Sequence, residues 1–417
     1  MNQEEIKKEI DNCLGCVNKN CQKGCPLSND ITEAIDLIKK NEYEKAYEKF
    51  LDTSVLLPIC GRICPHGKQC EGKCIKNIKG KSVNIGDIEA FLGDLWLDSN
   101  TEIKNFPEYN FVDKKVAIIG SGPSGITCAA TLKRFGVKEV VIYEKHSYMG
   151  GLLNHGIPNF RLEDEIVDKT YNKILDLGII VEYNKTLQEN IILNDLEKEY
   201  DAIFIACGAN ASSKMNIEGE NLEFVYGGNE LLENKELPDV SEKSIVVIGG
   251  GNVAMDVSRT LKRARAKSVK ILYRRTREQM PAEEKEINDT IKDSIEIIYN
   301  TNILRIFGEG KVECIKTRLV EEEGKRPYPV NIEGTNYVED TDMVVMAVGS
   351  NPEESVISSL GLNLNKWGYI EVDENYKTSK KNIFAGGDII GTKSTVAYAS
   401  VNGREAAKSI YKYLCEL

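Results

Sequence analysis

Eight of the twelve cysteines in this 417-residue chain lie before residue 75, in two closely spaced groups. The first group has the spacing C-x2-C-x4-C-x3-C and ends in a Cys-Pro pair. The second has the spacing C-x3-C-x5-C-x3-C, with a proline after its second cysteine. Thiolates spaced in this way can ligate iron–sulfur clusters, bind zinc or form disulfides. The eight residues are Cys13, Cys16, Cys21, Cys25, Cys60, Cys64, Cys70 and Cys74.

The spacing of these cysteines favours two [4Fe–4S] clusters. The pairs Cys25–Pro26 and Cys64–Pro65 are typical of the end of a ferredoxin cysteine run, whose last cysteine ligates the other cluster. Zinc ribbons use pairs of C-x2-C, and within these two groups that spacing occurs once, at Cys13. Four-thiolate zinc sites and thiol redox chemistry are the alternatives.

The residues around the cysteines predict a small helical domain over residues 1–112. Between the two groups, Ile31, Ile35 and Ile38 recur at helical spacing after a Ser-Asn-Asp capping stretch (28–30). A separate domain with so many soft ligands is expected to depend on metal for its stability.

After this domain the composition changes to that of a dinucleotide-binding fold. KKVAIIG (114–120) predicts a buried strand, GSGPSG (120–125) a glycine-rich turn, and the residues up to about Arg134 a helix. EVVIYE (139–144) predicts the next strand and ends in Glu144, nineteen residues after Gly125. The acidic residue at this distance makes the fingerprint specific.

Each glycine of this turn has a distinct role. Gly120 is expected to make the tight turn, Gly122 to let the backbone approach a pyrophosphate, and Gly125 to let helix and strand pack closely. The N-terminus of the helix offers free N–H groups to the phosphates. Glu144 is expected to accept hydrogen bonds from a ribose.

The chain then repeats the motif with one informative change. SIVVIGGGNVAMD (244–256) carries Gly249, Gly251 and Ala254 at the fingerprint positions, and SVKILYRR (268–275) predicts the second strand. Where the first copy has Glu144, this copy has Arg274. A guanidinium favours a ribose 2′-phosphate and therefore NADP, because a carboxylate there would repel the phosphate. Arg275 and Arg277 add positive charge, and the alternative is that Arg274 is a solvated strand end.

Two unequal fingerprints indicate two different dinucleotides, FAD at the first and NADPH at the second. NIFAGGD (382–388) predicts a short strand that runs into Gly387 and Asp388, an acid able to bond the ribityl chain of a flavin. The next stretch (392–414) predicts a helix whose N-terminus would stabilise negative charge on the flavin. DAIFIACG (201–208) and DMVVMAVG (342–349) predict strands that close the two nucleotide-binding halves.

These elements predict an α/β fold of two Rossmann-like, disulfide-reductase-type domains, the second inserted in the first, after the small α-helical domain. The expected FAD-binding domain covers residues 113–240 and 335–417, and the NAD(P)H-binding domain covers 241–334. A disulfide relay of the thioredoxin reductase type is disfavoured, because neither fingerprint is followed by C-x2-C or C-x4-C.

The bulk properties exclude several function classes. A formal charge of −11 opposes binding to nucleic acids and to anionic membranes. No stretch has the eighteen or so apolar residues that a spanning helix needs, and the first residues lack the basic and apolar regions of a signal peptide. A cytoplasmic location is expected, which also disfavours disulfides.

Long matching segments make the chain resemble one known family. The eight-cysteine module, VNIGDIEAF (83–91), GSGPSG, YEKHSYMGGLLNHGIPNFRL (143–162), GGGNVAMD, YRRTREQMP (273–281) and FAGGD resemble the small subunit of NADPH-dependent glutamate synthase. That family is similar to the N-terminal half of dihydropyrimidine dehydrogenase and to the large subunit of NADH-dependent ferredoxin–NADP reductase. The resemblance spans essentially the whole chain.

The resemblance implies a crossed pattern of cluster ligands. One cluster would be held by Cys13, Cys16, Cys21 and Cys74, and the other by Cys25, Cys64, Cys70 and Glu89. In relatives the last position is a glutamine or glutamate, which makes Glu89 the expected ligand and Cys60 a bystander. Spacing alone leaves Cys60 as the alternative fourth ligand.

The resemblance also implies contacts to both dinucleotides. Arg161 resembles a flavin-contacting arginine, with a surface charge as the alternative. The expected FAD contacts are Gly120, Gly122, Pro123, Ser124, Gly125, Glu144, Lys145, Gly151, Leu152, Arg161, Gly208, Gly387, Asp388, Thr395 and Val396. The expected NADPH contacts are Gly249, Gly250, Gly251, Asn252, Val253, Arg274, Arg275, Arg277 and Gly349.

The function implied is electron transfer from NADPH through FAD and two [4Fe–4S] clusters to a larger or catalytic partner subunit, or to ferredoxin. Hydride transfer itself requires no acid–base residue of the protein. The expected partner is the large subunit of glutamate synthase, with a dihydropyrimidine dehydrogenase catalytic subunit or a ferredoxin–NADP reductase subunit as alternatives. A zinc-stapled nucleotide sensor without turnover is the alternative of another class.

Overall fold

The computed structural model describes residues 3–234, 236–322, 324 and 326–417, which form two compact units. Unit 1 comprises the chain up to residue 154 together with residues 159–209 and 352–417. Unit 2 comprises residues 155–158 and 210–351. None of the described helices combines the length and the hydropathy of a segment that crosses a bilayer.

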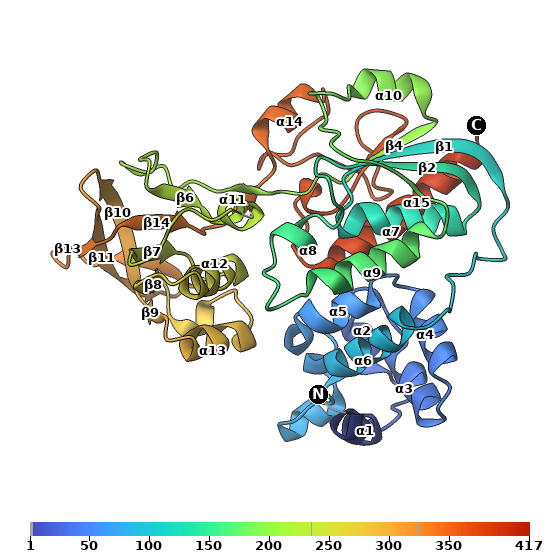
Figure 1. Cartoon of the computed structure of the whole chain (residues 1–417), viewed down its shortest axis with the longest axis horizontal. Coiled ribbons are helices and arrows are strands. Elements are labelled where there is room, and N and C mark those ends of the chain that lie inside the picture. Colours follow the sequence, from blue (N-terminus) through green and yellow to red (C-terminus); the bar gives the residue numbers. More distant parts are fainter. Residues whose placement is uncertain (1–2, 235, 323, 325) are drawn as a thin grey trace. The chain divides into compact units, whose positions relative to one another are not determined.

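The first part of unit 1 is a helical module that contains the eight clustered cysteines, drawn in blue in Figure 1. The predicted helix is confirmed as α3, which begins at Ile31 because Asp30 caps it by accepting the backbone N–H of Glu33 at 3.2 Å. The apolar face of α3 is buried, as its helical spacing predicts. The elements of the module are α1 (Gln3–Asn12), α2 (Asn20–Gly24), α3 (Ile31–Lys39), α4 (Tyr43–Leu51), α5 (Leu57–Ile63), η1 (His66–Lys68), η2 (Glu71–Lys73), η3 (Ile75–Lys79) and α6 (Ile85–Leu97).

The rest of unit 1 is built on a parallel five-stranded sheet of order β16-β4-β1-β2-β3. The strands are β1 (Val112–Ile119), β2 (Val137–Tyr143), β3 (Ile180–Glu182), β4 (Ala202–Ile205) and β16 (Ile383–Ala385). The helices are α7 (Pro123–Arg134), α8 (Leu152–His155), α9 (Asp164–Leu175), α10 (Leu193–Glu199), α14 (Glu354–Ser359), η5 (Asp388–Ile390) and α15 (Val396–Cys415). The strand β16 comes from far along the sequence and pairs with β4, so the C-terminal segment completes this sheet.

Two arginines attach the helical module to the sheet helices of unit 1. Arg134, at the end of α7, donates to the carbonyl oxygens of Leu51 and Lys104. Arg404, on α15, donates to the carbonyls of Leu27 (3.0 Å) and Thr53 (2.9 Å). Charged donors on buried carbonyls are strong hydrogen bonds, which ties the cysteine loops to the dinucleotide fold.

Unit 2 repeats the parallel architecture with a sheet of order β6-β14-β7-β8-β9. Its strands are β6 (Val225–Gly227), β7 (Ser244–Ile248), β8 (Ser268–Leu272), β9 (Glu296–Ile298) and β14 (Met343–Met346). Its helices are α11 (Gly228–Glu233), α12 (Asn252–Arg263), η4 (Arg277–Gln279) and α13 (Glu284–Lys292). An antiparallel sheet adds β10 (Thr301–Phe307), β11 (Lys311–Val320), β12 (Tyr328–Asn331) and β13 (Tyr337–Asp340).

The two faces of the unit 2 sheet bury different partners. One face packs against α12 and the residues that lead into α13, through Val247, Ile271 and Met255 among others. The other face packs against β10 and β11, where Val246 and Val344 meet Ile306. Burial on both faces explains the continuous apolar runs of β7 and β14.

The unit boundaries differ from the expected domain limits of 241 and 334. Strand β6 pairs with β14, and β14 pairs with β7, so both flanking segments belong to the second sheet. The ribbon of β5 (Ala211–Ser212) and β15 (Ser350–Asn351) joins the two ends of the segment. Unit 2 therefore begins before β6 and ends after β14, because sheet pairing rather than sequence repeat sets its extent.

Candidate dinucleotide and iron–sulfur sites

The first glycine-rich turn lies between β1 and α7, as its sequence predicts. Gly120 has φ +99°, and a Cβ there would lie 2.6 Å from the Ala206 oxygen. A Cβ on Gly125 would lie 2.0 Å from the Gly120 oxygen. A Cβ on Gly122, in contrast, would meet no described atom within 4 Å. Two glycines are therefore required by packing, and the third keeps an open face for a ligand backbone or phosphate.

Glu144 is held in place by the same turn. It directly follows β2, is 4 % exposed, and accepts the Ser121 backbone N–H at 3.0 Å and the Ser121 hydroxyl at 2.5 Å. Its other oxygen accepts the His146 N–H at 2.9 Å. The Ser121 oxygen in turn accepts the Gly150 N–H at 3.0 Å. A carboxylate has further lone pairs, so Glu144 is preorganised to accept ribose hydroxyls.

Two more segments approach this turn from elsewhere in unit 1. A Cβ on Gly151 would lie 3.1 Å from the Gly122 Cα, and one on Gly387 would lie 2.9 Å from the Ser124 Cβ. The Ser124 hydroxyl and the Asp388 Oδ1 are buried and make no hydrogen bond with described atoms. A buried polar atom without a hydrogen-bond partner lowers the stability of the fold unless a ligand bonds to it. These two residues therefore fit the hydroxyl and phosphate groups of a dinucleotide such as FAD.

Burial dominates the electrostatics of Asp388. It raises the pKa of the carboxyl to about 6, and a hydrogen bond with Ser394 partly offsets this effect. A hydroxyl donor from a ligand would favour the charged form and lower this pKa again.

The helix α15 begins beside Asp388. Thr395 caps it by accepting the Tyr398 N–H at 3.4 Å, and Val396 is its first residue. Farther along this helix, Asn402 accepts the Gly387 N–H at 3.2 Å, and a Cβ on Gly403 would lie 2.1 Å from the Ser124 oxygen. Close approach of α15 to α7 therefore fixes the loop that carries Asp388.

The other expected FAD contacts of unit 1 lie around this region with less specific geometry. Pro123 is the first residue of α7, Leu152 begins α8, and Gly208 follows β4 with positive φ. Lys145 forms an ion pair with Glu353 at 3.5 Å. Arg161 is half-buried on the segment between α8 and α9.

The second glycine-rich turn lies in unit 2, between β7 and α12. Gly249 has φ +142°, and a Cβ there would lie 2.1 Å from the Ala347 oxygen. A Cβ on Gly250 would lie 2.5 Å from the Tyr273 ring, whereas one on Gly251 would approach only Pro281, at 3.9 Å. The plan of the first turn is therefore repeated, with Gly251 as the open position.

The first residues of α12 are tied to a neighbouring loop. Asn252, the first residue of α12, accepts the Glu283 N–H at 3.0 Å. Val253 packs close to Gly228 at the start of α11, and Gly349 follows β14 with positive φ. These contacts are within unit 2.

The three arginines after β8 differ in how they are engaged. Arg274 is exposed and makes no ion pair with described residues. The Arg275 Nε is buried and lacks a hydrogen-bond partner in the described chain. Arg277 forms an ion pair with Glu284 at 2.5 Å, which partly neutralises it. Arg274 and Arg275 are therefore the better candidates to meet a 2′-phosphate.

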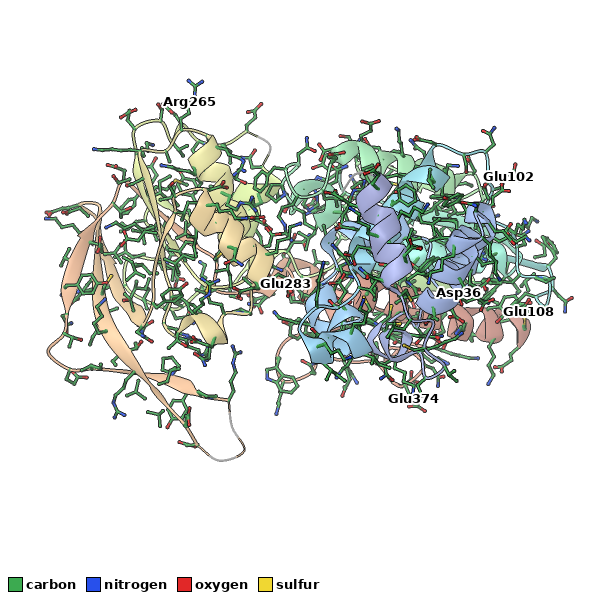
Figure 2. All side chains as sticks on the ribbon, turned by 90° about the horizontal axis from the view of Figure 1, so that it is seen from below. Asp36, Glu102, Glu108, Arg265, Glu283 and Glu374 are labelled. Atoms are coloured by element: carbon green, nitrogen blue, oxygen red, sulfur yellow. The ribbon has the colours of Figure 1, made fainter. Side chains whose placement is uncertain are left out.

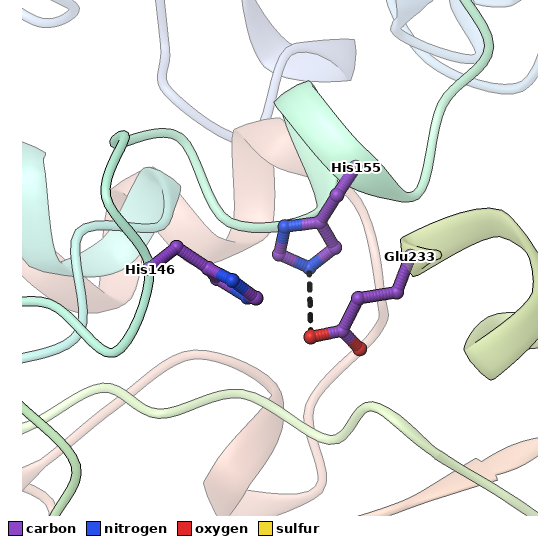
Figure 3. Close-up of side chains that lie close together, drawn as sticks. All are labelled: His146, His155 and Glu233. Atoms are coloured by element: carbon purple, nitrogen blue, oxygen red, sulfur yellow. Dashed lines mark ion pairs between the residues drawn. The ribbon is translucent and has the colours of Figure 1, made fainter. Parts of the chain in front are cut away.

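Unit 2 also contains a histidine–carboxylate pair. Figure 3 shows His155 and Glu233, whose Nε2 and Oε1 atoms lie 3.9 Å apart. This separation is longer than a hydrogen bond, so this ion pair alone does not fix the orientation of either side chain.

The module's cysteines form two groups. Cys13, Cys16, Cys21 and Cys74, named here thiol group 1, line one cavity together with Leu14 and Ile75. Burial raises the pKa of the Cys21 thiol, and the neighbouring Cys13 and Cys74 sulfurs raise it further. The structure thus brings Cys74 from the second sequence cluster to three cysteines of the first.

Thiol group 2 consists of Cys25, Cys64 and Cys70 together with Glu89. Burial and then the Glu89 carboxylate raise the pKa of Cys25 to about 12. The same two causes, in the same order, hold the pKa of Cys70 well above its ordinary value. A hydrogen bond with Cys60 and burial do so for Cys64, with Glu89 adding to the effect.

Glu89 and Cys60 differ in how many of these sulfurs they approach. The Glu89 charge acts on Cys25, Cys64 and Cys70, whereas in this group Cys60 acts on Cys64 alone. Burial raises the pKa of Glu89 to about 7, and His66 and Asn29 oppose this effect. Glu89 therefore lies close enough to all three sulfurs for its charge to act on them, and its role as the fourth ligand stays a prediction.

The spacing of the thiols is a test of which metal they fit. Among the described residues no three of these sulfurs lie within 4.8 Å of one another. Zinc–sulfur bonds of about 2.3 Å place tetrahedral thiolates about 3.8 Å apart. The described thiols therefore do not form the compact group of a preformed tetrahedral zinc site. All twelve cysteines are free thiols in the structure.

Sequence reasoning missed three residues that build these sites. Ser121 lies inside the glycine-rich motif, and its place between Glu144 and Gly150 could have been inferred from that motif. His66 contacts the Cys70 sulfur through Nδ1 at 3.3 Å and the Cys60 carbonyl through Nε2 at 3.1 Å. No sequence motif marks Asn402, because it reaches Gly387 only through its position on the face of α15 that packs toward this loop.

Comparisons with known proteins agree with this geometry. A family model described as pyridine nucleotide-disulphide oxidoreductase matches residues 114–406. A second model, dihydropyrimidine dehydrogenase domain II with a 4Fe-4S cluster, matches residues 1–101. These matches confirm the predicted family resemblance and the fold class.

Individual relatives and solved structures point the same way. The small chain of NADPH glutamate synthase from Escherichia coli K12 is 34% identical, covering 98% of this chain and 92% of that one. Subunit beta of the NADP(+)-dependent formate dehydrogenase of Moorella thermoacetica is 32% identical, covering 95% of this chain and 60% of that one. The fold of Mycobacterium tuberculosis FprA in complex with NADPH matches with a TM-score of 0.65 at 20% identity, over 73% of this chain and 85% of that one. The chain is therefore an oxidoreductase that belongs to the glutamate synthase small-chain family, within the pyridine nucleotide-disulphide oxidoreductases, and carries a 4Fe–4S domain of the dihydropyrimidine dehydrogenase type.

Proposed function

We propose that this protein takes electrons from NADPH and passes them through FAD and two [4Fe–4S] clusters to a partner subunit. Unit 2 would bind NADPH, the sheet of unit 1 would bind FAD, and the two thiol groups would each hold one cluster. When bound, these groups would supply the conversion of a two-electron hydride into single electrons.

One contact carries this proposal. The Cys64 thiol lies near the backbone N–H of Ala397, in the first turn of α15, and this N–H favours the charged form of the thiol and so lowers its pKa. The same helix end follows directly on the loop that carries Asp388. The N-terminus of α15 therefore lies between the expected FAD site and thiol group 2. This arrangement favours electron transfer between FAD and a cluster over a purely structural role for the metal.

The residues of the chain would bind and orient these groups. Glu144 and Asp388 would accept hydroxyl donors of FAD, while the open face of Gly122 would admit its phosphates. Arg274 and Arg275 would pair with the 2′-phosphate of NADPH. Backbone N–H groups near the sulfurs, such as that of Ala397 near Cys64, would tune the cluster potentials.

The partner is proposed from the names of relatives. One relative is a glutamate synthase small chain and another is a formate dehydrogenase subunit beta, so both belong to larger assemblies. The chain matches nearly the whole of the first and less than two thirds of the second. A glutamate synthase large subunit is therefore the first candidate, and a dehydrogenase catalytic subunit is the second.

Anaerobic purification tests the function. We expect a yellow-brown protein with about eight iron and eight labile sulfide atoms and one FAD per chain. Its visible absorption should bleach on addition of NADPH. A colourless protein that contains zinc would contradict the proposal and favour a nucleotide-binding sensor.

The eighth ligand can be tested by paired substitutions. Glu89→Ala should reduce the iron content from about eight to about four atoms per chain, because only thiol group 2 loses a ligand. Cys60→Ser should keep all of the iron. Iron analysis with electron paramagnetic resonance of the dithionite-reduced protein measures both, and the reverse pattern would make Cys60 the ligand.

A further inference from the structure

Thiol group 1 lies beneath a patch of exposed aliphatic side chains. Leu14 and Ile75 line its cavity, and Val17 and Ile78 lie three residues after them along the chain. Val17 is 95% exposed and Ile78 is 86% exposed. Ile75 and Ile78 are three residues apart in η3, and in a 3₁₀-helix such side chains lie on the same side. We name these four residues the exit patch.

The two loops of the exit patch are fastened to each other. Lys76 donates to the Asn12 side chain at 3.1 Å and to the Asn12 carbonyl at 3.3 Å. Lys39 donates to the Cys13 carbonyl at 2.9 Å. The aliphatic side chains are therefore held out on an anchored surface, where large exposed apolar groups indicate a binding site.

The segment that carries Ile75 and Ile78 is positively charged in an otherwise acidic protein. Residues 67–81 contain five lysines and one glutamate, a formal charge of +4 in a chain of −11. Lys23, Lys73 and Lys79 are exposed and make no ion pair in the described part of the chain. The neighbouring Lys19 and Lys81 are paired with Asp30 and Glu9.

Negative groups also lie near the patch. Asp11 is exposed beside Asn12, and Asp36 lies 3.9 Å from the position of a Cβ on Gly15. Figure 2 labels Asp36 on α3. Residues 67–81 keep a formal charge of +4 with Glu71 included, so this segment is positive relative to the rest of the chain.

We propose that the exit patch is the docking surface for an acidic electron-accepting protein. This inference rests on the proposed function and identifies where electrons leave the chain. Thiol group 2 contacts α15 through Cys64, whereas thiol group 1 borders the exposed patch, so group 1 is the outer of the two. An acidic partner is repelled by most of this surface and attracted to the lysines. A small apolar contact with a charged rim suits transient electron transfer.

The test uses the full-length, iron-loaded protein with NADPH as donor and a purified acidic ferredoxin as the acceptor probe. The variant Lys23→Glu/Lys73→Glu/Lys79→Glu should raise the KM for ferredoxin about tenfold or more and reverse the inhibition by salt. The matched control Lys366→Glu/Lys381→Glu/Lys412→Glu changes the net charge equally through lysines of residues 352–417. It should change the KM by less than about threefold.

Two further variants keep the test informative. Lys79→Glu alone disturbs the module least and should give a smaller rise in KM in the same direction. Val17→Ser/Ile78→Ser should lower kcat/KM for ferredoxin without changing its salt dependence. In every variant the iron content and the NADPH-driven reduction of a small dye should equal those of the wild type.

The outcomes separate the two proposals. A wild-type protein without iron would overturn the proposed function, and the docking surface with it. An iron-loaded wild type that reduces the dye but not the ferredoxin would overturn the acidic partner. Iron-loaded lysine variants that reduce ferredoxin like the wild type, or like the control variant, would overturn the docking surface alone.

Discussion

The two glycine-rich turns of this protein share a plan but differ in how their recognition residues are held. In unit 1, Glu144 is buried and fixed by hydrogen bonds from Ser121 and His146. In unit 2, the corresponding Arg274 is exposed and has no ion-pair partner among the described residues. A buried, preorganised acid suits a ligand that stays bound, because its ordering cost is met once during folding. An exposed cation suits a ligand that exchanges at every turnover.

The largest contrast is expected from the open glycine of each turn. Gly122→Ala should fold normally, because a Cβ there meets no described atom within 4 Å, but it should block the close approach of a phosphate. We expect FAD to be lost on purification, with affinity at least about tenfold weaker, a cost of about 1.4 kcal/mol.

The counterpart in unit 2 provides the control. Gly251→Ala meets only Pro281, at 3.9 Å, and should keep FAD bound while raising the KM for NADPH by a similar factor. Flavin absorbance of the purified proteins and NADPH–dye reductase kinetics measure both effects. Loss of FAD in the unit 2 variant instead would contradict the assignment of the two turns.

A smaller effect is expected from Arg274. Hydrogen bonds to charged groups contribute about 1.5–3 kcal/mol, so Arg274→Glu should lower the preference for NADPH over NADH by about 10- to 100-fold. Arg265, an exposed arginine of unit 2 labelled in Figure 2, provides the matched control Arg265→Glu. The ratio of kcat/KM for the two nucleotides measures the change, and equal ratios in both variants would refute a direct contact.

The smallest effect concerns pH. Burial raises the pKa of Asp388 from 3.8 to about 6, so in the FAD-free fold this carboxyl keeps a proton that the unfolded chain releases between those values. Its contribution to stability is therefore present below 3.8 and is lost as the pH rises through 6. FAD hydroxyls prefer the charged form, so FAD affinity should weaken as the pH falls below 6, by at most about tenfold per unit.

A conservative substitution isolates this group. Asp388→Asn should weaken FAD binding at neutral pH and remove the pH dependence near 6. Glu374→Gln, at an exposed acid labelled in Figure 2, should leave the titration unchanged. Fluorescence titration of FAD-depleted protein across pH 5–8 reads out both, and an unchanged pH profile in the Asp388 variant would assign the effect elsewhere.

Local sequence signals predicted the elements of both turns, because buried strands, glycines and helix caps act within about thirty residues. The helices α3, α7 and α15 and the strands of both fingerprints are confirmed close to their expected limits. The limits of unit 2 were not predictable in this way, since β6 and β14 are assigned by pairing with distant strands. The contacts of His66 and Asn402 were not predictable for the same reason. Their contacts depend on how helices pack in the folded protein, and a short sequence motif does not predict that packing.

The order of the sulfurs along the chain has a consequence for assembly. Thiol group 1 draws on residues 13 to 74 and thiol group 2 on residues 25 to 89, so each span contains members of the other. Two clusters held in this way would cross-link the module into two overlapping loops, not into two separate loops that follow each other in the sequence. The first cluster to bind should then order loops that also hold the ligands of the second, so cluster insertion during the biogenesis of this protein should be cooperative.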